Sequence, residues 1–306
     1  MSRRYEIQIE IENQCLLNCK HCSSLTMRHA AKKEFIETEV FEFLSLFKGS
    51  TFLYFTGGEP LLDLGIIEKI RKINFKYPNI NIGLYTCGII KTKNVVSPIS
   101  ISRAKDMKRA GIKECYISLY HEDEKIHDYI TNLKGSAIAT KESICNLLSS
   151  GIDVKIHLVV NKYNVFNLRT TLNEISKLGV KEIRLLRMVR CGSAEEYWDD
   201  IGVAYKVQNK SIIDIMSEKD KFKTRITVSG FPEIFPCRPF VDSIKCQSGI
   251  NVLYITHEGD VYPCACTKNG TNFLIGKISE LKKIKNYISK TYDIDYYEEC
   301  LNPIQE

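Results

Sequence analysis

The chain has 306 residues, of which 44% are hydrophobic and 26% charged, and its 43 Lys+Arg against 37 Asp+Glu give a net charge of +6. This length and composition exclude a mini-protein and an intrinsically disordered chain, and no apolar run approaches the roughly 20 residues needed to span a bilayer. Because residues 1–12 lack a signal-peptide core and no block of like charge indicates nucleic acid, we expect a cytoplasmic protein without a membrane or nucleic-acid partner.

The cysteine content is the unusual part of this composition, with 12 cysteines in the chain. A reducing cytoplasm removes disulfide bonding as an explanation for so many thiols. Metal ligation is therefore the first candidate role. For any single cysteine the alternative is a small buried hydrophobic residue, which we expect for Cys115 and Cys145 because both lie in apolar patterns.

In chain order, short runs of alternating, β-branched or aromatic residues are separated by stretches with the apolar spacing of a helix. The predicted strands are residues 5–11, 51–55, 81–85, 114–119, 154–160 and 182–188. Gly111, Gly151 and Gly179 each stand where a helix should end before the next strand. Six βα units of this kind predict a parallel sheet, open or wrapped toward a barrel, with functional groups at the carboxyl ends of its strands.

After residue 193 this alternation stops. We predict a first domain of residues 1–193, a connecting segment of 194–236 with one helix near 207–216, and a C-terminal domain of 237–306. In the last domain, 251–256 and 260–262 are expected to form a hairpin. This domain is too small to be stable through apolar burial alone, so we predict an α+β extension stapled by a metal group.

A cysteine motif follows the first predicted strand: Cys15, Cys19 and Cys22 have three and then two residues between them. A closed zinc site normally shows a second Cys or His pair about 12 to 20 residues further on, where His29 stands alone. Three thiolates on a compact loop suit three irons of a 4Fe–4S cluster and leave the fourth iron open. The spacing favours a cluster, and a nonenzymatic zinc-binding scaffold is the alternative.

A second motif ends the second predicted strand, where residues 56–60 read Thr-Gly-Gly-Glu-Pro. Two glycines let the backbone approach a ligand closely, and Glu59 can accept hydrogen bonds from an ammonium group. Taken with the three cysteines and with His21 beside the third of them, this pattern resembles the radical S-adenosylmethionine (radical SAM) superfamily. The resemblance extends over roughly residues 5–193 and resumes in the tail.

The resemblance implies a partial (β/α)6 TIM-like barrel with a 4Fe–4S cluster held by the three cysteines. It also implies reductive cleavage of SAM to a 5′-deoxyadenosyl radical, which abstracts a hydrogen atom from the substrate. The residues that it assigns to SAM binding are Gly57, Gly58, Glu59, Pro60, Thr86, Ser118, Asn161 and Arg187. Two positions differ from the family pattern, since Cys87 replaces a common Asn and Tyr120-His121 replaces a common Asp-Gly.

The tail resembles the SPASM or twitch extension, an auxiliary iron–sulfur domain of many radical SAM enzymes, because Cys246, Gly259 and Cys264 have its spacing. This implies one auxiliary cluster, expected to be 4Fe–4S, with Cys300 as a further ligand. Cys266, Cys237 or a substrate group is expected to complete the set. On a regular strand Cys264 and Cys266 would share a face, a relation that a turn would break.

The preferred substrate is a ribosomally made peptide, modified by crosslinking, thioether formation or epimerisation, because residues 127–128 and 161–164 resemble the peptide-modifying branch of the superfamily. Radical oxidation or rearrangement of a small molecule, such as an aminoglycoside or nucleotide, is the alternative. Cys237, Cys191 and Cys87, in that order, are our candidates for a hydrogen-atom donor or acceptor. A flavodoxin- or ferredoxin-type protein is the expected electron donor. Since the chain starts with a strand, a separate peptide-recognition protein is a further expected partner.

Overall fold

One curved sheet of ten strands organises the residues that the structure, a computed structural model, describes. These are residues 4–24, 37–47, 50–92, 95–231, 248–268 and 271–290. The strand order is β12-β11-β10-β1-β2-β3-β6-β7-β8-β9, and β9 and β12 at the two ends do not pair with each other. The sheet is therefore a partial, open barrel and largely parallel, as the sequence pattern predicts.

All six predicted strands are confirmed within this sheet. The parallel strands are β1 (Arg4–Glu12), β2 (Ser50–Gly57), β3 (Ile80–Thr86), β6 (Ile112–Ser118), β7 (Asp153–Val159), β8 (Glu182–Leu186), β9 (Arg225–Ser229) and β10 (Val252–Ile255). The antiparallel strands are β11 (Asp260–Tyr262) and β12 (Gly276–Lys277) in this sheet, and β4 (Ile89–Thr92) with β5 (Val95–Pro98) in a separate hairpin.

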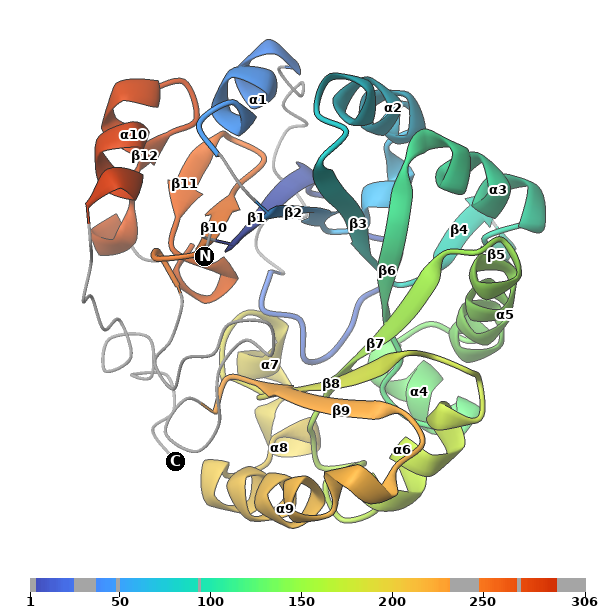
Figure 1. Ribbon diagram of the computed structural model, residues 1–306. Coiled ribbons are helices and arrows are strands. Elements are labelled where there is room, and N and C mark those ends of the chain that lie inside the picture. The colour runs from blue at the N-terminus through green and yellow to red at the C-terminus, as the bar shows by residue number, and fades with distance from the viewer. Residues whose placement is uncertain are drawn as a thin grey trace.

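Helices surround the convex side of the sheet (Figure 1). They are α1 (Glu37–Leu44), α2 (Ile66–Lys76), α3 (Ile101–Ala110), α4 (Glu124–Thr131), α5 (Ser136–Ser149), α6 (Leu168–Ser176), α7 (Ser193–Glu196), α8 (Trp198–Ile201), α9 (Tyr205–Ser217) and α10 (Leu281–Ser289), with single 3₁₀ turns η2 (Pro60–Leu62), η3 (Lys219–Lys221), η4 (Ala265–Thr267) and η5 (Thr271–Phe273). Gly111, Gly151 and Gly179 have φ of 112°, 77° and 81°, as the helix ends require.

Four strands outside the predicted six, β9 on one side and β10, β11 and β12 on the other, extend the sheet. β9, which lies in the predicted connecting segment, pairs in parallel with β8, and β10 of the tail pairs in parallel with β1. Figure 1 shows the orange β10 beside the blue β1. The expected hairpin of the tail is confirmed as β10 and β11. The sheet therefore has more strands than six βα units supply, because the predicted connecting segment and the predicted C-terminal domain both contribute strands to it.

Both faces of β1 are buried, but with different side chains. Ile7, Ile9 and Ile11 lie in the main apolar core together with helix residues such as Ile70. The alternate positions carry glutamate and glutamine, which are also buried. Because the helices cover the convex side, these polar side chains belong to the concave face. A parallel strand is ordinarily apolar on both faces, so this polar row marks the interior of the barrel as a functional surface.

Aromatic and charged side chains line the concave face. The rings of Tyr54 and Tyr85 stack with centroids 4.6 Å apart, and those of Tyr116 and His157 stack at 4.4 Å. Arg184 lies with its guanidinium carbon 4.5 Å from the centroid of Tyr116 and is 1% exposed. A cation over an aromatic face is a favourable arrangement in a desolvated interior.

The two cysteines that we expected in the core differ in their exposure to solvent. Cys115 on β6 is fully buried, as predicted. Cys145 is exposed, so the core prediction for it is wrong. It lies on α5 beside the buried Ile144, and adjacent helix positions point in directions about 100° apart, so a pattern of apolar neighbours does not settle which of them faces inward.

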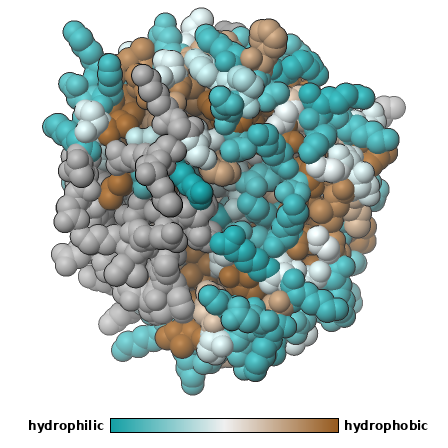
Figure 2. All heavy atoms as spheres, in the orientation of Figure 1, coloured by the Kyte–Doolittle hydropathy of each residue, from teal (hydrophilic) through white to brown (hydrophobic). Residues whose placement is uncertain are grey.

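The visible molecular surface of the described residues is mostly polar. Figure 2 shows hydrophilic side chains over much of the visible face, with apolar residues in scattered patches between them. None of the helices in the described ranges combines the length and the apolar character needed to cross a bilayer.

Candidate active site at the carboxyl ends of the strands

The loop after β1 carries the cysteine motif across the mouth of the barrel, where Figure 1 shows it near the centre of the view. Cys19 is buried, and Cys15 and Cys22 are half-buried. The backbone N–H of Lys20 donates to the Ile130 carbonyl at 2.9 Å, which docks the loop on the end of α4. The loop is therefore held by the fold itself.

The surroundings of these thiols fit an iron–sulfur cluster. Cys19 packs in a small apolar cluster with Leu17, Ile89 and Tyr120, and Cys15 and Cys22 lie at its edge. Within the described ranges, no three Cys, His, Asp or Glu side chains converge closely enough to hold a single metal ion. An apolar shell around these thiols limits the access of solvent to a bound cluster.

Lys20 attaches the cysteine loop to a distant part of the chain. Its ammonium lies 2.7 Å from Asp200 on α8 and 3.2 Å from the centroid of the Tyr129 ring. The hydroxyls of Tyr129 and Tyr163 also donate to Asp200. The sequence does not predict these contacts around Asp200. It shows there only an ordinary Asp-Asp pair, 180 positions after Lys20.

The Gly-Gly-Glu-Pro segment packs directly against the cysteine loop. The N–H of Gly58 donates to the Glu12 carbonyl at 2.7 Å, and the N–H of Glu59 donates to the Gln14 carbonyl at 2.7 Å. A Cβ on Gly57, whose φ is 134°, would lie 1.9 Å from the Glu12 oxygen. A Cβ on Gly58 would lie 2.1 Å from the Gln14 oxygen. Only glycine allows this approach of two backbones.

We therefore expect Gly58→Ala to separate the two segments and to weaken SAM binding at least about tenfold, since a clash with backbone cannot be relieved by side-chain rotation. The matched control is Gly65→Ala, because a Cβ there meets only the Asp63 carboxylate at 3.4 Å and the end of Lys69 at 3.8 Å. Calorimetric titration of each protein with SAM measures the effect. Equal affinities in the two variants would contradict this role of Gly58.

Glu59 ties this segment to the end of β3. Its fully buried carboxylate accepts hydrogen bonds from the Thr86 hydroxyl at 2.6 Å, from the Cys87 N–H at 2.8 Å and from the Leu61 N–H at 3.0 Å. Burial raises its pKa above the usual range in spite of these bonds. The structure thus shows Glu59 orienting the turn from within the fold, and its role as acceptor for a bound ammonium stays a prediction.

Two histidine rings pack against Tyr120 beside the cysteine loop. The His21 ring meets Tyr120 edge to face at a centroid distance of 4.3 Å, and the His127 ring stacks on it at 5.5 Å. The N–H of Tyr120 donates to Nδ1 of His127, so that nitrogen carries no proton. Burial lowers the pKa of His127 to about 4. His127 is fully buried, so it belongs to the packed interior beside this loop.

This burial makes stability depend on pH. The pKa of His127 is about 4 in the folded chain, against an ordinary value of 6.5. Between these two pH values the unfolded chain binds a proton that the folded chain does not bind, so the free energy of unfolding decreases as the pH falls. From about pH 7 to about pH 5 the loss expected from this group is about 2 kcal/mol. His127→Asn keeps an acceptor without a titrating ring and should remove that loss. Urea unfolding of both proteins tests this, and parallel pH curves would contradict it.

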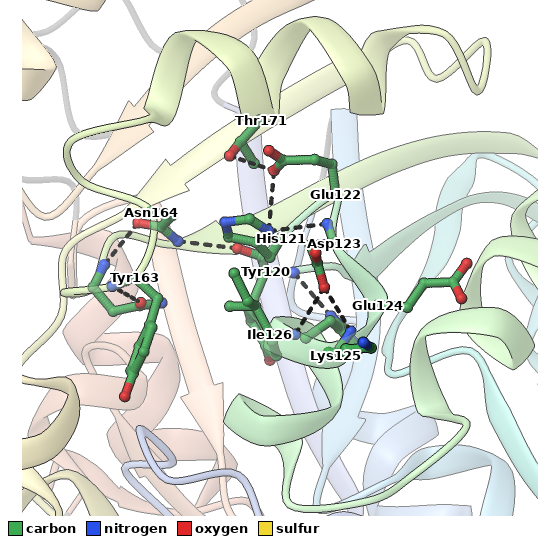
Figure 3. A network of polar contacts seen from close by, with 12 residues as sticks. Tyr120, His121, Glu122, Asp123, Glu124, Lys125, Ile126, Tyr163, Asn164 and Thr171 are labelled. Atoms are coloured by element: carbon green, nitrogen blue, oxygen red, sulfur yellow. Dashed lines mark hydrogen bonds and ion pairs between the residues drawn. The ribbon is translucent and has the colours of Figure 1, made fainter.

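Polar side chains at the ends of β6 and β7 hold the neighbouring turns together, as Figure 3 shows. Asn164 accepts from the Asn161 N–H at 2.9 Å and donates to the Tyr120 carbonyl at 3.0 Å. Asn161 itself accepts from the Tyr163 N–H. Asp128 likewise accepts from the backbone N–H groups that open α5. These segments therefore support the fold, and Asn161 contacting SAM stays a prediction.

The remaining predicted SAM residues also end strands at this edge. Ser118 ends β6 and is half-buried, and Pro60 begins η2 after Glu59. Arg187 follows β8, with its guanidinium carbon 5.7 Å from the centroid of Tyr205. Its Nε and Nη1 are buried and have no hydrogen-bond partner within the described residues. A buried guanidinium of this kind is suited to an anionic group.

The two lower-ranked candidate thiols lie next to the cysteine loop. Cys87 is buried at the end of β3, and Cys191 is half-buried after β8. Burial raises the pKa of both thiols, so both are protonated near neutral pH. The N–H of Ser193 donates to the Cys22 carbonyl at 2.8 Å, which brings the Cys191 turn to the cysteine motif. A hydrogen-atom transfer role stays a prediction for both, and Cys237 lies outside the described residues.

In the tail, the structure describes two of the predicted auxiliary ligands. Cys264 and Cys266 flank the start of η4, so they do not share the face of a strand, and only Cys264 is buried. Hydrogen bonds from Cys266, Ser248 and Thr267, of which the Cys266 bond is the strongest cause, lower the pKa of Cys264 to about 5. A thiolate is the ligand form that metals require. Cys246 and Cys300 lie outside the described residues.

Comparison with known proteins identifies relatives over most of the chain. A model of the radical SAM superfamily matches residues 9–175. The AdoMet-dependent heme synthase of Nitratidesulfovibrio vulgaris is 23% identical over 273 residues, which cover 83% of this chain and 72% of that protein. A GTP 3′,8-cyclase of Helicobacter pylori is 25% identical over 274 residues, which cover 84% of this chain and 79% of that protein.

Solved structures share the fold at low sequence identity. Streptococcus suis SuiB bound to S-adenosylmethionine superposes with a TM-score of 0.70 at 13% identity, covering 94% of this chain and 66% of SuiB. This chain thus spans slightly less than two thirds of SuiB. Native anSMEcpe with bound AdoMet superposes with a TM-score of 0.69 at 18% identity, covering 96% of this chain and 88% of that chain.

Proposed function

Because the chain belongs to the radical SAM superfamily, we propose that it uses a 4Fe–4S cluster and SAM to abstract a hydrogen atom from a ribosomally made peptide. Membership itself implies the cluster and SAM. When bound, this pair supplies a 5′-deoxyadenosyl radical, and the protein supplies positioning and the exclusion of water.

One observation carries the assignment of the site: the cysteine loop and the Gly-Gly-Glu-Pro segment lie against each other at the carboxyl ends of the strands. Cys15, Cys19 and Cys22 are the ligands that would hold the cluster. The N–H groups of Gly58 and Glu59 donate to the carbonyls of Glu12 and Gln14, where β1 ends and that loop begins. SAM held by these two segments would therefore meet the open iron and the concave face of the sheet together.

The peptide substrate is supported by proteins that share the fold. SuiB has a structure bound to its precursor peptide SuiA, and anSMEcpe has one bound to the Cp18Cys peptide. The sequence segments that resembled the peptide-modifying branch give no support of their own, because Asp128 and Asn164 are occupied in holding turns. We propose crosslinking, thioether formation or epimerisation as the outcome.

The proposal includes three further components of the reaction. A flavodoxin- or ferredoxin-type protein would deliver the electron, and a separate recognition protein would present the peptide. An auxiliary cluster in the tail would bind substrate or accept an electron. The lowered pKa of the Cys264 thiol, to which a hydrogen bond from Ser248 contributes, supports this thiol as a ligand.

The test of the proposed function is peptide-dependent turnover. The reconstituted, reduced protein is incubated anaerobically with SAM and with the peptide encoded by the nearest short open reading frame. We expect 5′-deoxyadenosine together with a peptide of altered mass, and deuterium in 5′-deoxyadenosine when the peptide is deuterated. Formation of 5′-deoxyadenosine that rises with GTP or an aminoglycoside but not with the peptide would replace the peptide by a small-molecule substrate.

A further inference from the structure

One lysine of the tail joins three separate segments at the mouth of the barrel. Lys268 follows η4, and its ammonium lies 2.7 Å from Glu10 Oε1 on β1, 2.7 Å from the hydroxyl of Ser24 and 3.3 Å from the hydroxyl of Tyr254 on β10. An ammonium has three N–H donors, so each contact can use one of them. Ser24 is the second residue after Cys22, so this contact reaches the end of the cysteine loop.

The pair that Lys268 forms with Glu10 is buried, with side chains 3% and 2% exposed. Glu10 also accepts from the Tyr254 hydroxyl at 2.5 Å and from the His257 N–H at 3.2 Å. Burial acts to raise the pKa of Glu10, but the side-chain hydrogen bond of His257 and the charge of Lys268 outweigh it and lower the pKa to about 2. Glu10 therefore stays ionised and holds the ammonium in place.

The same loop end is also held by the chain that follows β8. The N–H of Ser193 donates to the carbonyl of Cys22, and a Cβ on Gly192 would lie 2.5 Å from that carbonyl oxygen. Residues 22–24 are thus held both by the chain after β8 and by the tail.

We propose that Lys268 is a positioning residue for the radical-cluster loop, through which the C-terminal part of the chain sets the placement of Cys22. The inference rests on the proposed function only in taking this loop as the cluster site. A buried ion pair is weak as a source of stability, because the desolvation of two charges offsets their attraction. What the ion pair contributes here is the hydrogen bond from Lys268 to Ser24, which an apolar pair of equal size could not make.

Ser24→Ala is the first test, because it removes the contact to the loop and leaves the Glu10–Lys268 pair intact. We expect unchanged iron content and thermal stability, a changed EPR spectrum of the reduced cluster with SAM, and SAM cleavage lowered about tenfold, as for the loss of one hydrogen bond to a charged group. Lys268→Met should change the spectrum in the same way. Lys277→Met is the control, since that tail lysine pairs with Asp260 at the surface.

The double variant Glu10→Gln with Lys268→Met separates positioning from stability. Removal of both charges should restore thermal stability relative to Lys268→Met, because no unpaired charge stays buried, but the altered spectrum should persist. Return of both stability and spectrum to wild-type values, or a wild-type spectrum in Ser24→Ala, would overturn the inference. If the wild-type protein holds its cluster but cleaves no SAM, the proposed function fails, and the spectra still decide the role of Lys268.

Discussion

Replacement of Cys15, Cys19 and Cys22 together by alanine is expected to remove about four irons per chain from the radical site and to abolish SAM cleavage, since no thiolate is left there to hold the cluster. The three thiols share one loop and one apolar cluster, and Cys87 in the same cluster is a poor substitute ligand because burial raises its pKa and keeps it protonated. Iron and sulfide analysis after anaerobic reconstitution, together with 5′-deoxyadenosine measured by mass spectrometry, checks both parts of the result.

Cys145→Ala is the matched control, because that thiol is exposed on α5. It should keep both the iron and the cleavage of the wild-type protein. Cleavage that survives in the triple variant would refute the assignment of the cluster loop. Zinc in place of iron in the wild-type protein, with no cleavage, would support the alternative of a metal-binding scaffold.

Replacement of Cys246 and Cys264 by alanine is expected to leave SAM cleavage in place and to stop product formation. The reason is that these thiols belong to the tail, while the radical cluster depends on the loop after β1. Metal binding contributes folding free energy, so the tail should also lose stability. Iron content, 5′-deoxyadenosine, product mass and protease sensitivity of the tail are the measurements.

The comparison with Lys268→Met sharpens this second prediction. The cysteine variant keeps both charges of the Glu10–Lys268 pair and the Tyr254 hydroxyl that contacts them, so cleavage should fall less in it than in Lys268→Met. Iron content equal to that of the wild-type protein would show that Cys246 and Cys264 are not ligands. Loss of all iron would show that the two sites do not form independently.

Local patterns predict most of the barrel. The six strands and the helix ends at Gly111, Gly151 and Gly179 follow from residue periodicity and from the backbone freedom of glycine, which act over a few neighbours. The strands β9 and β10 are different. A five-residue and a four-residue run carry little periodicity of their own, and their place in the sheet depends on pairing with β8 and β1.

The candidate site divides in the same way. The amino-acid sequence by itself determined the chemistry, because the spacing of Cys15, Cys19 and Cys22 and the Gly-Gly-Glu-Pro segment are local features. Only the tertiary structure decided how these pieces are held. Lys268 and Glu10 are 258 positions apart, and Lys20 and Asp200 are 180 apart. No local pattern selects one charged partner among many over such separations, so these contacts exist only once the folded sheet has brought β1, β8 and β10 together.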